Sequence, residues 1–140
     1  MATARERINK LLPALHTRIY RATKGRVGGQ LGSANILLLT TTGRRSRQPR
    51  TTPLNYFVDG DRIVLIASNG GSDRHPAWYL NITDTPAVTI ERNADTQAMT
   101  ARVATAEEKA ALWPRIVDWY SGYGKYQQRT DRDIPLVILG

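Results

Sequence analysis

Residues 37–56, which read LLLTTTGRRSRQPRTTPLNY, constrain the fold more than any other part of this chain. A strand-like run rich in Leu, Thr and aromatic residues lies on each side of a short connection. Gly43 and Pro49 bound that connection, and both residue types are typical of turns. Two strands joined so closely pair as an antiparallel hairpin, so the sequence predicts an antiparallel sheet here.

The tip of this hairpin is strongly basic. Four arginines lie in or beside the turn, and six short hydroxyl side chains surround them. The arginines are Arg44, Arg45, Arg47 and Arg50, and the hydroxyls belong to Thr40, Thr41, Thr42, Ser46, Thr51 and Thr52. The planar guanidinium fork matches phosphate and carboxylate groups. We therefore expect an anionic ligand at the tip, although a solvated turn or a nucleic-acid patch would also explain the charges.

The composition fits one basic domain. The chain has 140 residues, a formal net charge of +8 and a sequence pI of about 10.3. This charge favours an acidic partner: nucleic acid, an anionic membrane surface, or a phosphorylated or carboxylated small molecule. The chain has no Cys, which excludes disulfides, thiol catalysis and Cys-based metal sites, and agrees with a reducing cytoplasm.

The first 26 residues form a separate segment of the sequence. Apolar residues at helical spacing predict an amphipathic helix over residues 4–22, with basic residues on its other face. Such a helix packs on the domain's own core or rests on an anionic membrane. No apolar run approaches the roughly 20 residues that span a bilayer.

The remainder alternates between strand and helix signals. Strands are predicted at about 35–42, 50–58, 62–68, 88–92, 97–104 and 134–139. A short helix is predicted at 77–82, and a longer one begins at Thr105, with Glu108 completing a capping box. The sequence thus predicts one mainly β domain whose strands close on themselves, with peripheral helices.

Several side chains could serve a site. Trp78 could form the wall of a pocket for a flat heterocycle, and Tyr120, Tyr123 and Tyr126 recur every three residues, as on one face of a helical lid. His75 precedes the short helix, where a role in the turn is the simpler interpretation. The two histidines are far apart, have no paired carboxylates nearby and do not resemble a metal site.

Three ordered segments resemble one known family. Residues 37–56, 59–81 and 119–135 are similar to the deazaflavin-dependent nitroreductases of mycobacteria and other actinobacteria. The resemblance implies a split β-barrel, like that of FMN-binding proteins, over residues 27–140. It also implies reduced coenzyme F-420 as cofactor and hydride transfer to a quinone, a nitroaromatic or an activated enone. The cofactor has a flat ring and an anionic tail with a phosphate and several glutamates. This tail matches the anionic ligand expected at the arginine-rich tip.

The resemblance also implies roles for individual residues. Tyr120, Tyr123 and Tyr126 would shape the acceptor pocket. The hydride must be followed by a proton, and the candidate catalytic sources are the Tyr123 phenol and a water held by Ser68, with bulk solvent as the alternative. No metal is implied. The cofactor would contact Arg44, Arg45, Ser46, Arg50, Thr51, Thr52, Pro53, Leu54, Asn55, Ile66, Ala67, Ser68, Asn69, Ala77, Trp78, Tyr79, Leu80, Asn81 and Tyr123.

Three positions depart from the family pattern. Arg45 replaces a lysine, Arg47 replaces a glycine, and Asn69 stands where a lysine is common. We expect Arg47 to be dispensable for the ligand. Two alternatives remain: an FMN-dependent split-barrel oxidoreductase, and a non-catalytic basic module that binds membranes or nucleic acid. On the deazaflavin hypothesis the partner is a small-molecule electron acceptor and not nucleic acid. The protein would then be cytoplasmic, with peripheral contact to the inner face of the membrane as an option.

Overall fold

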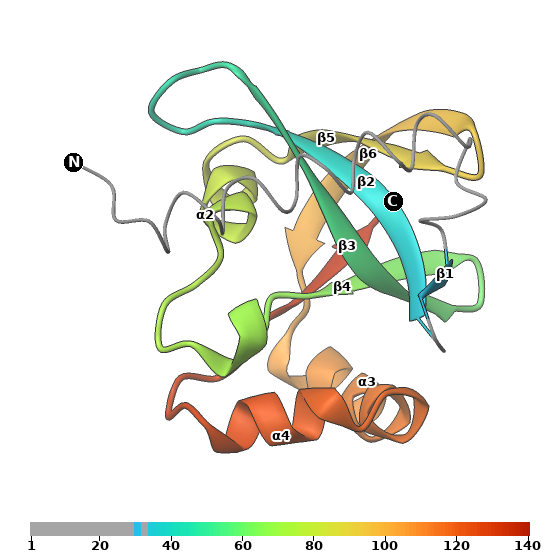
Figure 1. The fold of residues 1–140 in the computed structure, drawn as a ribbon, viewed down its shortest axis with the longest axis vertical. Helices are drawn as coiled ribbons and strands as arrows, with labels where there is room; N and C mark the ends of the chain where they lie inside the picture. Colours follow the sequence, from blue (N-terminus) through green and yellow to red (C-terminus); the bar gives the residue numbers. More distant parts are fainter. Residues whose placement is uncertain (1–29, 32–33) are drawn as a thin grey trace.

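The computed structural model describes residues 30–31 and 34–140, so the predicted helix at 4–22 lies outside the described residues. The strands are, in chain order, β1 Gln30–Leu31, β2 Ala34–Thr42, β3 Pro49–Asp59, β4 Arg62–Ile66, β5 Ala87–Arg92, β6 Asp95–Val103 and β7 Leu136–Leu139 (Figure 1). Strands β2 to β7 match the six predicted strands, although β4 ends at Ile66 and β7 begins at Leu136, and the short β1 was not predicted.

Six of these strands form a closed barrel. The order is β2–β3–β4–β7–β6–β5, and β5 pairs with β2 again through Leu38–Glu91, Leu39–Ile90 and Thr40–Thr89. Every pairing is antiparallel. The predicted mainly β split barrel is thereby confirmed.

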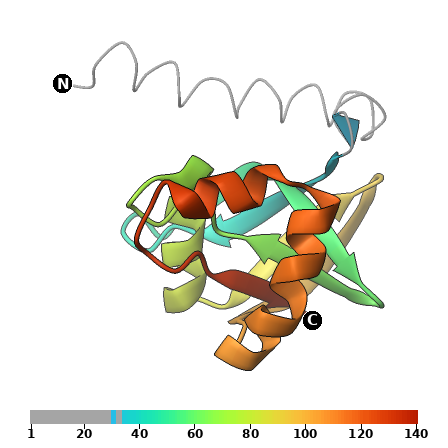
Figure 2. The ribbon, with the colours of Figure 1, turned by 90° about the horizontal axis from the view of Figure 1, so that it is seen from below.

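The helices lie outside the barrel. They are the short 3-10 turn η1 Asn69–Gly71, α2 Ala77–Asp84, α3 Ala106–Trp119 and α4 Gly122–Gln128. Helices α3 and α4 lie together across one face of the barrel, and α2 lies at its side (Figures 1 and 2). Thr105 caps α3, and its side chain and that of Glu108 form the predicted capping box.

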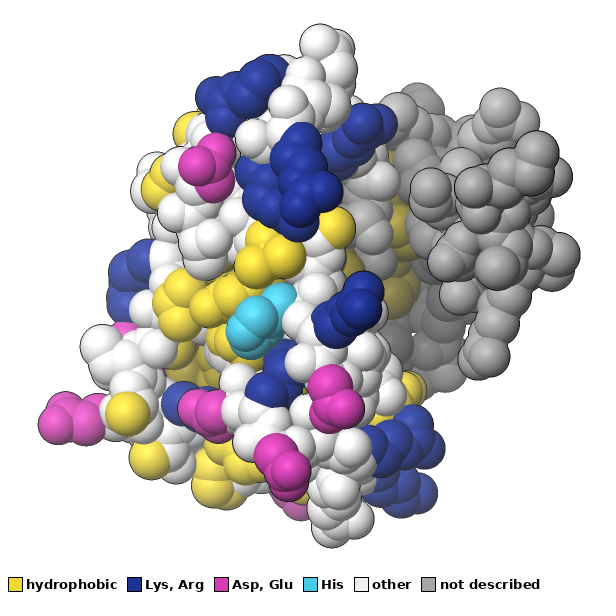
Figure 3. Space-filling model, turned by 90° about the vertical axis from the view of Figure 1, so that its left-hand side faces the viewer, with side chains coloured by type: hydrophobic (Ala, Val, Ile, Leu, Met, Phe, Trp, Pro, Cys, Tyr) yellow, Lys and Arg dark blue, Asp and Glu magenta, His cyan; other side chains and the backbone are white. Residues whose placement is uncertain are grey.

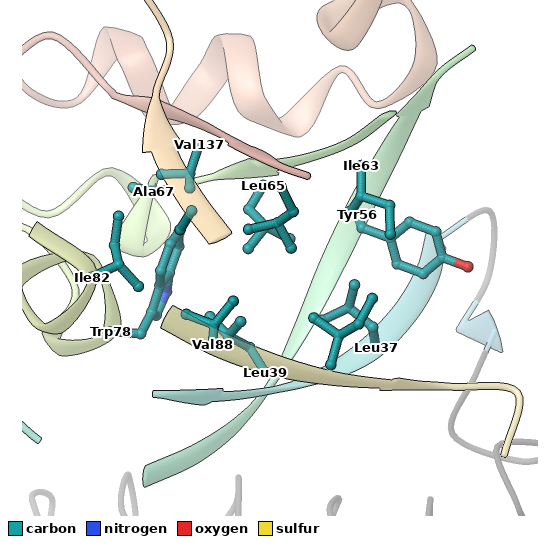
Figure 4. Packing of buried hydrophobic residues seen from close by; sticks show 13 residues of the cluster. Leu37, Leu39, Tyr56, Ile63, Leu65, Ala67, Trp78, Ile82, Val88 and Val137 are labelled. Carbon is teal, nitrogen blue, oxygen red and sulfur yellow. The ribbon is translucent and has the colours of Figure 1, made fainter. Parts of the chain in front are cut away.

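Alternation along the strands produces two apolar layers. One face of β4 sends Ile63 and Leu65 into the barrel, where they pack with Leu37, Trp78 and Val137 (Figure 4). The other face sends Val64 and Ile66 outward, against Leu112, Ile116 and Tyr123 of α3 and α4. Because successive strand residues face opposite sides, one strand serves both layers.

The barrel is split along the first half of β3. This strand pairs with β2 from Pro49 to Asn55, but with β4 only from Tyr56 to Asp59. No described strand pairs with the other edge of residues 49–55. Two residues of this half, Pro49 and Pro53, have no backbone N–H, and proline suits strand edges for that reason. The split leaves room beside β3.

Candidate active site

A cavity of about 1280 Å³ lies beside the open edge of β3. Its other walls come from the loop after β4, the first turn of α2, and the tyrosines around α4. The volume exceeds the roughly 300–1,000 Å³ typical of small-ligand pockets, so it can hold a cofactor and a second molecule. Figure 3 shows this side of the molecule, with Lys and Arg side chains along the upper part and hydrophobic side chains across the middle.

The cavity brings together most of the residues predicted for the site. The hairpin, β3, the loop after β4, α2 and α4 all contribute. Predicted residues in its lining are Arg44, Arg45, Ser46, Arg50, Thr51, Thr52, Pro53, Leu54, Asn55, Ile66, Ser68, Asn69, Ala77, Trp78, Asn81, Tyr120, Tyr123 and Tyr126.

Three predicted cofactor contacts do not line the cavity. Ala67 is fully buried and packs in the barrel core, on the opposite face from its neighbours Ile66 and Ser68. Tyr79 and Leu80 belong to α2 but lie off the face that carries Trp78 and Asn81. In these two places the prediction treated a continuous run as lining, whereas Ala67 faces away from Ile66 and Ser68, and in a helix only residues three or four apart share a face.

The arginine end of the cavity is a tightly folded turn. Gly43 closes it through backbone hydrogen bonds to Gln48 and Arg47, and a Cβ at Gly43 would lie 2.5 Å from Ser46 Oγ. The backbone N–H of Arg44 donates to Asn81 Oδ1 at 3.1 Å, and Asn81 Nδ2 donates to Thr41 Oγ1 at 3.1 Å. Asn81 therefore holds the hairpin against α2 with both ends of its amide.

Two of the four arginines differ sharply in their surroundings. Arg45 is exposed and lines the cavity. Arg47 lies off the cavity, where its guanidinium pairs with Asp84 at 3.1 Å and reaches Thr85 Oγ1 at 3.3 Å. Its φ of 59° is the left-handed conformation that a glycine adopts freely. This placement agrees with the expectation that Arg47 makes no ligand contact, which stays a prediction.

The centre of the cavity holds a buried phenol and a buried amide. Tyr123 is 6% exposed, and its hydroxyl oxygen accepts a hydrogen bond from Asn55 Nδ2 at 2.9 Å. Burial raises the pKa of Tyr123 to about 12, so the phenol stays protonated and can donate. Asn55 Oδ1 is buried and has no partner among the described residues, which leaves it available for a donor on a ligand.

The tyrosine wall is built where α3 meets α4. The rings of Tyr120 and Tyr123 are 5.0 Å apart, and those of Tyr123 and Tyr126 are 6.0 Å apart. The prediction of one helical face was wrong for Tyr120, which is the C-cap of α3. Gly122 permits the junction, because a Cβ there would lie 2.6 Å from the Tyr120 ring.

The loop after β4 contributes residues that the sequence did not assign to the site. Gly70, Ser72, Arg74, His75 and Pro76 line the cavity, as do Ile36, Thr41 and Gly43. Gly71 has φ +82°, and a Cβ there would lie 2.8 Å from the Tyr126 carbonyl oxygen, so the loop packs directly on α4. The signal for His75 was its position just before a helix at the end of a glycine-rich loop.

Two classes of feature are absent from the described part of the chain. Within residues 30–31 and 34–140, no group of three His, Cys, Asp or Glu side chains is placed to hold a metal ion. None of the helices that the structure describes combines the length and apolar character needed to cross a bilayer.

Comparisons with known proteins identify the family. The model of the F-420H(2)-dependent quinone reductase family matches residues 13–140. An F-420H(2)-dependent quinone reductase of Mycobacterium tuberculosis is 41% identical over 129 residues, which are 89% of this chain and 87% of that protein. A second protein of M. tuberculosis, named as a putative reductase of the same kind, is 37% identical over 103 residues, 74% of this chain and 87% of that one.

A solved structure gives the same result. It is described as an F-420-H2-dependent reductase, is 36% identical, superimposes with a TM-score of 0.68, and covers 75% of this chain and 93% of its own. The resemblance to deazaflavin-dependent reductases is therefore confirmed, and with it the cofactor class. This chain belongs to the family of F-420H(2)-dependent quinone reductases, oxidoreductases whose cofactor is reduced coenzyme F-420.

Proposed function

We propose that the cavity beside β3 is where this protein binds reduced coenzyme F-420 and passes its reducing equivalents to a quinone. Membership of the family supports the cofactor and the reaction. The observation that supports this location for the site is the pair Asn55–Tyr123. It places an unpartnered acceptor oxygen and a protonated phenol in one cavity whose rim carries arginines. When bound, the reduced deazaflavin supplies a hydride to the acceptor, and the protein provides binding and orientation.

The lining of the cavity fits the parts of this cofactor. Arg45 and Arg50 are exposed at one end, where they match the phosphate and carboxylates of the tail. Ile66, Pro53 and Trp78 offer apolar surface to the flat ring. Asn55 Oδ1 offers an acceptor to a ring N–H, which would remove the one buried unpaired side-chain atom of the described residues.

The tyrosines fit the acceptor side. Tyr120 and Tyr126 flank Tyr123 in the cavity wall and give the acceptor an aromatic surface. Asn55 Nδ2 donates to one lone pair of the Tyr123 hydroxyl oxygen, which leaves the Tyr123 O–H to donate to an acceptor oxygen as negative charge develops there. Ser68 lines the same cavity and can hold a water for the proton that completes the reduction.

Titration with the cofactor tests the proposal directly. Coenzyme F-420 should quench the fluorescence of the chain's three tryptophans with saturable, salt-sensitive binding, and FMN should bind far more weakly. The reduced cofactor should then be oxidised by quinones, and nitroaromatics and enones measure how far the acceptor range extends. A protein that binds FMN in preference to F-420 would contradict the proposal.

A second part of the proposal concerns location. We propose that the basic helix predicted at residues 4–22, which lies outside the described residues, brings the enzyme to the anionic inner face of the membrane, where lipid-soluble quinones reside. The predicted cytoplasmic location is part of the same proposal. The full chain should sediment with anionic liposomes and not with neutral ones, and a chain that lacks residues 1–26 should lose this binding while retaining cofactor binding. Equal sedimentation of both chains would contradict it.

A further inference from the structure

Arg132, in the segment between α4 and β7, binds the loop that forms one wall of the cavity. Its guanidinium donates three hydrogen bonds to backbone carbonyls: Nη1 to Ala67 at 3.1 Å, Nη2 to Ser68 at 2.7 Å, and Nε to Ser72 at 2.8 Å. The side chain is half-buried, so these carbonyls have little water to replace it. The loop is thus held in one conformation by a residue about sixty positions away.

The same guanidinium also reaches the His75 ring. Arg132 Nη1 lies 3.3 Å from His75 Nδ1. A guanidinium has only donors, so Nδ1 can take part only as an acceptor, without a proton. The neutral imidazole must then carry its proton on Nε2. The Tyr79 ring lies 4.6 Å from the His75 ring, centroid to centroid, and restricts its rotation.

His75 Nε2 is the ring nitrogen that remains for a ligand. His75 is half-buried and lines the cavity, and no described residue forms a hydrogen bond with Nε2. The Nε2–H of this ring is fixed by a neighbouring cation, held by an adjacent tilted aromatic ring and left unused by the described residues, so it is suited to donate to a ligand oxygen.

We propose that Arg132 is a positioning residue that fixes His75 as the Nε2–H tautomer, and that His75 thereby donates a hydrogen bond to an oxygen of the bound cofactor or of the quinone. Both ligands carry oxygen acceptors, so the chemistry is shared. The proposal rests on the proposed function for its ligand, but the tautomer belongs to the free protein. The two can therefore fail separately.

The tautomer is tested without any ligand. Nitrogen NMR of imidazole in alkaline solution, where the ring is neutral, distinguishes a protonated from an unprotonated nitrogen. The chain has two histidines, so a His16→Gln variant leaves His75 as the only signal. We expect an unprotonated Nδ1 and a protonated Nε2 in this variant, and a mixture of tautomers when Arg132→Met is added. A protonated Nδ1 with Arg132 present, or the same tautomer after its loss, would overturn the assignment.

The donor role is tested by a pair of variants at His75. The amide of asparagine ends where Nδ1 lies and can still accept from Arg132, whereas that of glutamine reaches the position of Nε2 and can donate. His75→Asn should weaken ligand binding about 10-fold and His75→Gln only about 2- to 3-fold, as for the loss and retention of one hydrogen bond.

Two readouts locate the ligand oxygen. A raised Kd for F-420 in the absence of quinone assigns it to the cofactor, whereas a raised KM for the quinone at unchanged Kd assigns it to the acceptor. Arg132→Lys, which keeps the charge but not the planar fork, should weaken the same step as His75→Asn but by a smaller factor, because part of the tautomer mixture still donates. Arg102→Met, which breaks an ion pair with Glu108 outside the cavity, should resemble the wild type. Wild-type Kd and KM in His75→Asn would overturn the donor role. Failure of the wild type to bind F-420 would instead overturn the proposed function.

Discussion

A Tyr123→Phe variant is expected to reduce a quinone with a kcat about 100-fold below that of the wild-type protein, at a nearly unchanged Kd for the cofactor. The variant retains the ring that packs against Tyr120 and Tyr126, and loses only the hydroxyl that can donate to the acceptor oxygen. Stopped-flow oxidation of the bound reduced cofactor measures the effect on the reaction step, and tryptophan quenching measures the Kd.

Tyr56→Phe is the matched control, because Tyr56 is buried in the barrel core and does not line the cavity. It should leave kcat unchanged. The state of the phenol can be checked by alkaline titration, since a pKa of about 12 for Tyr123 predicts an ionisation near pH 12 that the variant lacks. In the unfolded chain the phenol ionises at about 10, so its contribution to stability falls as the pH rises from 10 to 12. Full turnover of Tyr123→Phe on every acceptor would remove the phenol from the reaction.

Loss of two cavity-facing arginines is expected to weaken cofactor binding at least about 100-fold, since each charge-assisted hydrogen bond contributes about 1.5–3 kcal/mol and both side chains are at the solvent-exposed, lower end of that range. The change is Arg45→Met combined with Arg50→Met. Both side chains are exposed and line the arginine end of the cavity. The Kd should be measured for coenzyme F-420 and for the deazaflavin without its phosphate and glutamates, and only the former should change.

The matched control is Arg47→Met combined with Arg115→Met. It removes the same two charges, but from side chains that pair with Asp84 and Asp59 outside the cavity. The net charge falls by two in both double variants, so the difference between them reports the position of the arginines at the cavity and not the net charge of the protein. Equal Kd values for the two would show that the hairpin acts only through net charge.

Local signals in the sequence were sufficient for most of the fold. Thr105 and Glu108 form the capping box that their spacing predicts, because the motif depends only on residues three apart. Gly43 and Pro49 bound the predicted hairpin turn for a similarly local reason. The sequence predicted that the strands close on themselves, but not that β5 pairs with β2. Such a pairing and its register depend on contacts between strands that are distant in the chain.

The site was harder to predict, because its details depend on residues far apart in the chain. A matching motif placed Ala67 at the ligand, yet strand alternation turns it into the barrel core. Arg132 lies within the matching segment 119–135 but was assigned no role. Its contacts with Ser68 and His75 span 64 and 57 positions of the chain. Nothing in the local pattern of residues 129–133 indicates such contacts.

The split in the barrel has a consequence for how molecules of this protein meet each other. An unpaired strand edge is normally a place where a second chain can add a strand and begin aggregation. Along residues 49–55, Pro49 and Pro53 offer no N–H to such a strand, and Arg50 between them adds a charge. The prolines that suit the open edge beside the cavity thus also disfavour edge-to-edge association between copies.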